Sequence, residues 1–261
     1  MPEHTPESTP LSREWQAFWL ALGFLTRIPM LVRIDYSQAL MNRSSVYFPV
    51  IGLLLGALYA LAYLLMALLW PPVVSLLLVL ALHLWLTGAF HEDGLADSVD
   101  ALGGGYTVAD RLRIMKDSRI GTYGTVALVT ALALKVALLA EASPVWLALL
   151  IAPCVARLTP LLMMRAMHYV SDPGTSKSKP VAEAFSGRRL LVATAFVALA
   201  CLAMMPWAPM LPILAAISVT LVGLAWGRNL EHNIGGYTGD ALGAGVVFTE
   251  LALLLGLAAL A

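Results

Sequence analysis

The chain has 261 residues, of which 60% are hydrophobic and only 12% are charged, whereas about a quarter of the residues of a soluble domain are charged. Together with the mean hydropathy of +0.82, this composition predicts a protein embedded in lipid and excludes an ordinary soluble domain. The 16 basic and 16 acidic residues cancel, so no net charge favours binding to nucleic acid.

The N-terminal segment, residues 1–14, is polar, acidic and rich in proline, and it lacks the basic start of a secretory signal peptide. We expect it to form a disordered cytoplasmic tail, and residues 15–261 to form a single membrane-embedded catalytic domain. Residues 15–30 are apolar but short, rich in aromatic side chains and closed by Pro29. This pattern favours a helix that lies in the membrane interface or re-enters the membrane, and a full span is the alternative.

Seven further segments approach the roughly 20 apolar residues that a helix needs to cross a bilayer. They are residues 47–70, 73–90, 122–141, 145–166, 190–206, 210–227 and 241–260. Several of the short connections between these segments contain proline, which ends a helix. The pattern predicts an all-α polytopic integral membrane protein with about seven transmembrane helices plus the N-terminal helix.

The basic residues predict the orientation of these helices. Lysine and arginine gather before the first span and in the loops after the second, fourth and sixth spans, whereas the loops on the opposite side contain neither. Cytoplasmic loops collect basic residues. We therefore expect the long loops, and an active site built on them, at the cytoplasmic face.

An acidic stretch, HEDGLADSVD at residues 91–100, follows the second predicted span at this cytoplasmic boundary. If the span continues as one helix, Asp93, Asp97 and Asp100 share a face, because they are spaced i, i+4 and i+7. Three such carboxylates repel one another at low dielectric, and a divalent cation such as Mg²⁺ removes that cost. The stripe predicts a Mg²⁺ site, with Gly94 leaving room for a phosphate or a backbone; a solvated helix end is the alternative.

The loop that follows is rich in cations. Thr107 and Asp110 form a capping-box pattern that predicts a short helix after the glycines at residues 103–105. On this helix we expect Arg113 and Lys116 to share a face. Arginine and lysine beside a metal site can bind the oxygens of a pyrophosphate, and anchoring to lipid headgroups is the alternative for each cation.

A second glycine-rich junction, GGYTGDALGAG at residues 235–245, enters the last predicted span from the cytoplasmic side. Its Asp240 can either cap the helix N-terminus or bind a metal, and the sequence leaves both readings open. Lys135 and Arg157 lie inside predicted spans, where they either pair with each other or extend to the interface, and neither receives a role.

Four motifs, in order along the chain, closely resemble the cobalamin synthase family: FLTRIP at residues 24–29, GAFHEDGLADSVDALGGG at 88–105, RLRIMKDSRIGTYG at 111–124 and GGYTGDALGA at 235–244. Members of this family are adenosylcobinamide-GDP ribazoletransferases, Mg²⁺-dependent enzymes of the bacterial inner membrane. The resemblance implies that adenosylcobinamide-GDP and α-ribazole, or its 5′-phosphate, react to give adenosylcobalamin, or its 5′-phosphate, and GMP.

The resemblance also implies roles for the residues of these motifs. The expected ligands of Mg²⁺ on the pyrophosphate are Asp93, Asp97 and Asp100, with Asp117 or Asp240 completing the metal shell or acting as the base. The expected phosphate-binding residues are Arg113, Lys116 and Arg119, with Gly94 beside them and Arg27 of FLTRIP reaching the same site. The bilayer is a further partner, and homo-oligomerisation or association with other cobalamin-assembly enzymes is left open.

Three other functions use similar residues. A CDP-alcohol phosphotransferase of lipid synthesis would release CMP, but Asp97 stands where the arginine of that motif is expected. An aspartate-rich prenyl transferase would release inorganic pyrophosphate. A cation-coupled transporter usually binds its ion near the bilayer midplane, whereas these carboxylates gather at one end of the spans.

Overall fold

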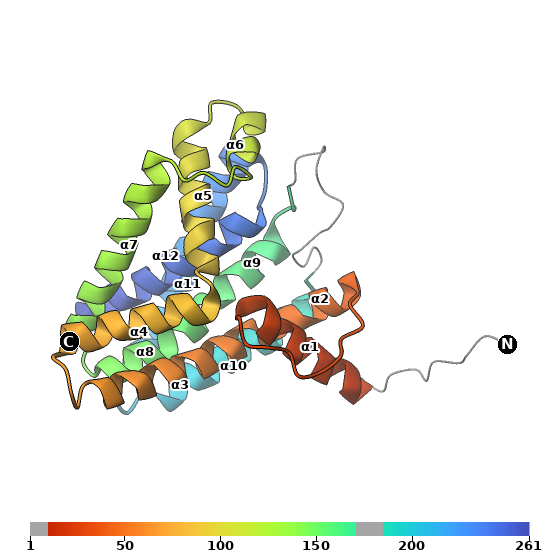
Figure 1. Cartoon of the computed structure of the whole chain (residues 1–261). Helices are drawn as coiled ribbons and strands as arrows, with labels where there is room; N and C mark the ends of the chain where they lie inside the picture. Colours follow the sequence, from red (N-terminus) through yellow and green to blue (C-terminus); the bar gives the residue numbers. More distant parts are fainter. Residues whose placement is uncertain (1–9, 171–184, 261) are drawn as a thin grey trace.

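The computed structural model describes residues 10–170 and 185–260. Within these ranges the regular structure is helical (Figure 1), which confirms the predicted all-α class. An isolated parallel bridge between Tyr169 and Tyr237 is the only β-type pairing in the described part of the chain.

The helices follow one another along the chain with short connections. They are α1 (Pro10–Leu25), α2 (Gln38–Ser44), α3 (Phe48–Met66), α4 (Pro72–Thr87), α5 (Phe90–Gly104), α6 (Val108–Ile114), α7 (Thr122–Glu141), α8 (Val145–Ala156), α9 (Leu158–Ala166), α10 (Gly187–Ala203), α11 (Leu211–Ile234) and α12 (Gly239–Ala258). A 3₁₀ turn, η1 (Ser45–Tyr47), joins α2 to α3. The core forms where α3 packs on α8 and where α12 contacts α5, α8 and α11.

Among the described residues, five helical segments are long and apolar enough to cross a membrane: Gln38–Met66, α7, Val145–Ala166, α11 and α12. The pair α4 and α5 makes a sixth if it is one broken span. The predicted span at residues 190–206 corresponds to α10, which has 17 residues and is shorter than these five segments. Length and composition thus support a polytopic membrane protein with five or six spans, and the expected number of seven stays a prediction.

The second predicted span does not continue as one helix into the acidic stretch. Gly88 and Ala89 both adopt left-handed backbone conformations, with φ of 68° and 56°, and α4 and α5 are bent by 85° relative to each other (Figure 1). Glycine adopts this conformation readily, whereas alanine does so at a steric cost. The condition that the span continues as one helix is therefore not met, and α5 begins anew at Phe90.

The N-terminal helix begins earlier than the expected end of the tail. Because α1 starts at Pro10, residues 10–14 are helical, while residues 1–9 lie outside the described residues. Glu14 of this segment accepts hydrogen bonds from Arg43 at 2.9 Å, from Tyr47 at 2.8 Å and from Arg189 at 2.7 Å. These bonds attach α1 to α2, to η1 and to α10.

Candidate active site

The acidic stripe lies on α5 as the spacing predicts, although that helix runs in an unexpected direction. Asp93, Asp97 and Asp100 occupy one face of α5 at i, i+4 and i+7. Asp93 is exposed, Asp97 is half-buried and Asp100 is buried. The three carboxylates therefore form a line that runs from the surface into the protein.

A close contact between α5 and α12 brings a fourth carboxylate to this line. A Cβ atom on Gly94 would lie 2.6 Å from the backbone oxygen of Asp240 and 3.1 Å from its Cα atom, so only glycine permits this approach. Of the two occupants that the sequence allowed beside Gly94, the structure shows the backbone. Asp240 consequently lies close enough to Asp93 to repel it electrostatically.

Asp240 does not cap α12. Thr238 is the N-cap residue, and its hydroxyl accepts a hydrogen bond from the backbone N–H of Ala241 at 3.2 Å. The loop before it is held by backbone hydrogen bonds from Tyr237 to His168 and from Val170 to Tyr237, both of 2.9 Å. The reading of Asp240 as the N-cap residue is therefore wrong. Asp240 lies in the first turn of α12, where its carboxylate bonds to its own backbone N–H, and it is close enough to Asp93 to be repelled by it.

Three carboxylates, which we call the carboxylate cluster, lie near the contact of α5 with α12 and act on one another electrostatically: Asp93, Asp97 and Asp240. Asp97 is partly desolvated and is repelled by Asp93, Asp240 and Asp100. Lys116, from the loop after α6, acts on Asp240 as an opposite charge. The cluster thus carries more negative charge than Lys116, the neighbouring lysine, can balance.

The carboxylate cluster offers hard oxygen donors of the kind that Mg²⁺ prefers. In the described part of the chain, no three His, Cys, Asp or Glu side chains are arranged to hold a metal by themselves. Nucleotide sites usually bind Mg²⁺ through one or two carboxylates, together with water and substrate phosphates. The donor set therefore fits an open site that a phosphate ligand completes, and it does not form a closed protein cage.

Asp100 has a structural role of its own. Its two carboxylate oxygens accept hydrogen bonds from the backbone N–H groups of Gly121 at 2.6 Å and Gly124 at 2.8 Å. These amides belong to the first turn of α7, where a negative charge is favourable. Asp100 thereby holds the N-terminus of α7 against α5.

Asp117 is engaged on its own loop. It accepts hydrogen bonds from the guanidinium of Arg119, the shortest of them 2.7 Å, and from the backbone N–H of the same residue. The side-chain hydrogen bond from Arg119, with the backbone bond, lowers the pKa of Asp117 to about 2. Asp117 is thus engaged by Arg119 on its own loop, away from the expected role as a ligand of the metal.

The expected phosphate-binding residues of this loop separate in space. Thr107 caps α6 through the N–H of Asp110, which confirms the capping pattern. However, α6 ends at Ile114, so Lys116 lies beyond the helix and does not share a helical face with Arg113. Arg113 is exposed and lies 3.6 Å from the carboxylate of Asp110. Of these cations, Lys116 is the one that acts on the carboxylate cluster.

Arg27 lies at the break between α4 and α5. Its backbone N–H donates a hydrogen bond of 2.7 Å to the carbonyl of Leu86, and its Nε atom would lie 2.6 Å from a Cβ atom on Gly88. The N–H of Asp93 bonds to the carbonyl of Ala89, so this break directly precedes the first turn of the acidic helix. The structure thus places Arg27 next to the start of the stripe.

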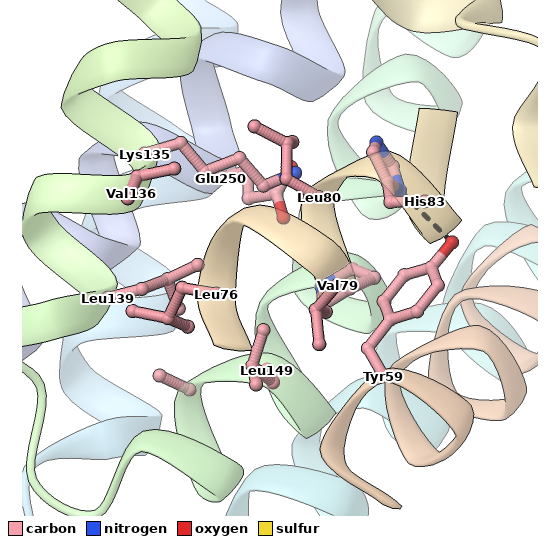
Figure 2. Close-up of a pocket in the computed structure, with 12 residues that line it drawn as sticks. Tyr59, Leu76, Val79, Leu80, His83, Lys135, Val136, Leu139, Leu149 and Glu250 are labelled. Carbon is pink, nitrogen blue, oxygen red and sulfur yellow. Dashed lines mark hydrogen bonds and ion pairs between the residues drawn. The ribbon is translucent and has the colours of Figure 1, made fainter. Parts of the chain in front are cut away.

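Glu92 points away from the stripe and into the protein. It is 4% exposed, and its Oε1 atom lies 2.8 Å from Nε2 of His83. The other ring nitrogen of His83 lies 3.0 Å from the hydroxyl of Tyr59 (Figure 2). This chain of polar contacts joins α3, α4 and α5 across the break, and the position of Glu92 about 100° from Asp93 on a helix was its only signal in the sequence.

The buried cations of the spans have partners that the sequence did not reveal. Lys135 of α7 forms an ion pair of 2.9 Å with Glu250 of α12, and both line the small cavity of Figure 2. Lys135 therefore neither pairs with Arg157 nor extends to the interface. Arg157, between α8 and α9, is 2% exposed, and its Nη1 donates to the carbonyl of Pro153 at 2.8 Å.

Comparisons with known proteins identify the family of the chain. The chain matches the family model of cobalamin-5-phosphate synthase over residues 17–258. It is 42% identical over 241 residues to the adenosylcobinamide-GDP ribazoletransferase of Shewanella pealeana, covering 90% of this chain and 91% of that protein. The proteins of the same name from Vibrio cholerae (42% over 252 residues, 94% of each chain) and Ralstonia pickettii (40% over 254 residues, 95% and 97%) are similarly close. No solved structure matches. The chain therefore belongs to the cobalamin-5-phosphate synthase family.

Proposed function

We propose that the chain transfers the cobinamide-phosphate moiety of adenosylcobinamide-GDP to α-ribazole, or to α-ribazole 5′-phosphate, and releases GMP. The observation that carries this proposal is the carboxylate cluster at the contact of α5 and α12, with Lys116 beside it. Its residues belong to two of the family motifs, and relatives that cover nearly the whole chain bear the name of this activity.

The reaction breaks a pyrophosphate and forms a phosphodiester. A ribose hydroxyl of the acceptor attacks the phosphorus next to the cobinamide arm, and the bond from that phosphorus to the oxygen of GMP breaks. Lys116 would neutralise charge on the pyrophosphate and on the leaving GMP. Mg²⁺, held by carboxylates of the cluster, would supply Lewis-acid stabilisation of the same oxygens.

The attacking hydroxyl must lose a proton. Mg²⁺ usually takes one or two carboxylates in sites of this kind, whereas the cluster has three, so one carboxylate remains to accept this proton. Asp100 supports the site from behind, because it holds α7 against α5 and thereby sets the path of the loop that carries Lys116.

For the localisation, we propose a bacterial inner membrane with the catalytic loops facing the cytoplasm. The distribution of lysine and arginine between the loops supports this orientation. The loop after the fourth predicted span contains Lys177 and Lys179, which lie outside the described residues. Cysteine labelling of single loops in intact cells tests the orientation, and labelling of residues 105–120 from the outside would contradict it.

Nucleotide release tests the function directly. The purified protein in detergent, supplied with adenosylcobinamide-GDP, Mg²⁺ and either form of α-ribazole, should release GMP in an amount equal to the cobalamin product. Release of CMP from a CDP-activated lipid would instead identify a CDP-alcohol phosphotransferase. Absence of GMP with both acceptors would refute the proposal.

A further inference from the structure

The guanidinium of Arg157 is incompletely bonded deep inside the protein. Its Nη1 atom donates to the carbonyl of Pro153, which fixes the orientation of the group. Its Nε and Nη2 atoms are buried and have no hydrogen-bond partner. These two atoms form the edge with which arginine binds carboxylates and phosphates through two parallel hydrogen bonds. A buried charged donor without a partner is strongly unfavourable, so the open edge points to a ligand.

The acidic side chains nearest to Arg157 do not close this edge. Glu92 and Glu250 act on Arg157 electrostatically, but Glu92 bonds to His83 and Glu250 bonds to Lys135. The Oε2 atom of Glu92 has no hydrogen-bond partner either, so it does not bond to Arg157. The protein therefore balances the charge of Arg157 at a distance and leaves its bidentate edge open.

Arg157 lines a small pocket that adjoins the candidate active site. The cavity has a volume of about 30 Å³, which is room for about two water-sized atoms and thus for the two oxygens that the edge of one arginine binds. Residues Gly239, Leu242, Gly243 and Val246 of α12 line it, and their spacing of i, i+3, i+4 and i+7 places them on one face of that helix. Asp240 stands on the neighbouring face.

The rim of this pocket is aromatic. Phe24 packs against Phe48 with ring centroids 5.8 Å apart and against Phe90 at 5.2 Å, and all three line the pocket. Phe90 is 39% exposed, so it offers a surface on which a flat apolar group can stack. The site therefore suits a ligand that combines one oxyanion with a flat apolar group.

We propose that this pocket binds the acceptor as α-ribazole 5′-phosphate, with its phosphate on the Nε and Nη2 atoms of Arg157 and its flat base on the aromatic rim. The inference rests on the proposed function. The pyrophosphate of the donor belongs to the carboxylate cluster and Lys116, and Arg157 is not among the charges that act on Asp97 or Asp240. Arg157 thus offers a second site for an oxyanion, on a face of α12 next to the one that carries Asp240. A second phosphate is present only when the acceptor is α-ribazole 5′-phosphate.

Steady-state kinetics with both acceptors tests this assignment. In Arg157→Gln, the KM for α-ribazole 5′-phosphate should rise about 10- to 100-fold, the loss expected for hydrogen bonds to a charged group. The KM for unphosphorylated α-ribazole and the KM for adenosylcobinamide-GDP should not change. Arg157→Lys, which keeps the buried charge but loses the two-pronged edge, should show the same selectivity and is the variant to measure if Arg157→Gln does not fold.

The matched control is Lys135→Met, which removes another buried cation that does not line this pocket. It should lower the thermal stability without distinguishing the two acceptors. An equal rise in KM for both acceptors in the Arg157 variants would show a purely structural role. A raised KM for adenosylcobinamide-GDP would place the pyrophosphate at Arg157. Unchanged kinetics would show that no phosphate binds in this pocket. Each of these results overturns the assignment.

Direct binding separates this inference from the proposed function. If the wild-type protein releases no GMP with either acceptor, the proposed function fails. In that case α-ribazole 5′-phosphate should still raise the apparent Tm of the wild-type protein in detergent, and it should not raise that of the Arg157 variants. An equal shift in both proteins, or no shift in either, would refute the pocket.

Discussion

Replacing Gly94 by alanine tests whether the contact of α5 and α12 builds the candidate active site. The added Cβ atom would lie 2.6 Å from the backbone oxygen of Asp240, whereas ordinary contacts begin at about 3.4 Å. Because the atoms it meets are backbone, no side-chain rotation relieves the overlap, and the two helices must separate by roughly 0.8 Å. Asp240 then moves away from Asp93 and Asp97.

Two opposing effects set the size of the change in stability. Alanine is favoured over glycine inside a helix by about 1 kcal/mol, while overpacking a close contact costs about 1–3 kcal/mol. Because the overlap is with rigid backbone, we expect the overpacking to prevail and the free energy of unfolding to fall by up to about 2 kcal/mol. A displacement near 1 Å in an active site can lower the rate by about 100-fold, so GMP release should fall far more than stability.

The assay compares Gly94→Ala with Gly104→Ala, on the same helix. At Gly104 the nearest atom to an added Cβ is the flexible Cδ1 of Ile114, at 3.7 Å, so this control should keep both its apparent Tm and its rate of GMP release. Equal rates for Gly94→Ala and the wild-type protein would show that the close approach does not position the carboxylates, and the description of the site would have to be abandoned.

Other perturbations test single residues. Asp93→Asn should abolish turnover while the protein still inserts and elutes as a single species in detergent; a purified variant with normal activity would remove Asp93 from the site. Chelation of divalent cations with EDTA should stop GMP release and added Mg²⁺ should restore it, whereas full activity in EDTA would contradict the proposed cofactor. Asp100→Ala should lower the free energy of unfolding by about 2 kcal/mol, because two N–H groups of α7 lose their acceptor; an unchanged melting curve would argue against this anchoring role. Lys116→Ala should raise the KM for adenosylcobinamide-GDP, because Lys116 is the cation that acts on the carboxylate cluster; unchanged kinetics would remove Lys116 from the pyrophosphate site.

Much of the fold class followed from local patterns. The apolar segment at residues 122–141 coincides with α7, and the capping pattern at Thr107 starts α6 where expected. The family assignment from four short motifs is confirmed by matches over nearly the whole chain. These features depend on the composition and spacing of neighbouring residues, which a sequence displays directly.

The candidate site was only partly predictable. Helical spacing predicts the row of aspartates on α5, and Lys116 is among the residues expected to bind phosphate. The loss of helix continuity at Ala89 was hidden, because a left-handed alanine has no sequence signature. The inward orientation of Glu92 and the pairing of Lys135 with Glu250 were hidden too, because each depends on which distant helix packs against the residue.

The sequence by itself determined that this protein is a helical membrane protein, that acidic and basic residues gather at one set of loops, and which family it belongs to. Only the tertiary structure decided that Asp240 lies beside Asp93 and Asp97, that Asp100 supports α7, and that Arg157 lines a pocket and has two buried nitrogens without a partner. The physical reason is the separation in sequence of the residues involved: hydrophobic composition and helical periodicity are properties of residues that are close neighbours in the chain. The meeting of α5 with α12 instead depends on whether two surfaces far apart in the sequence fit closely, and at Gly94 that fit depends on the absence of a single methyl group.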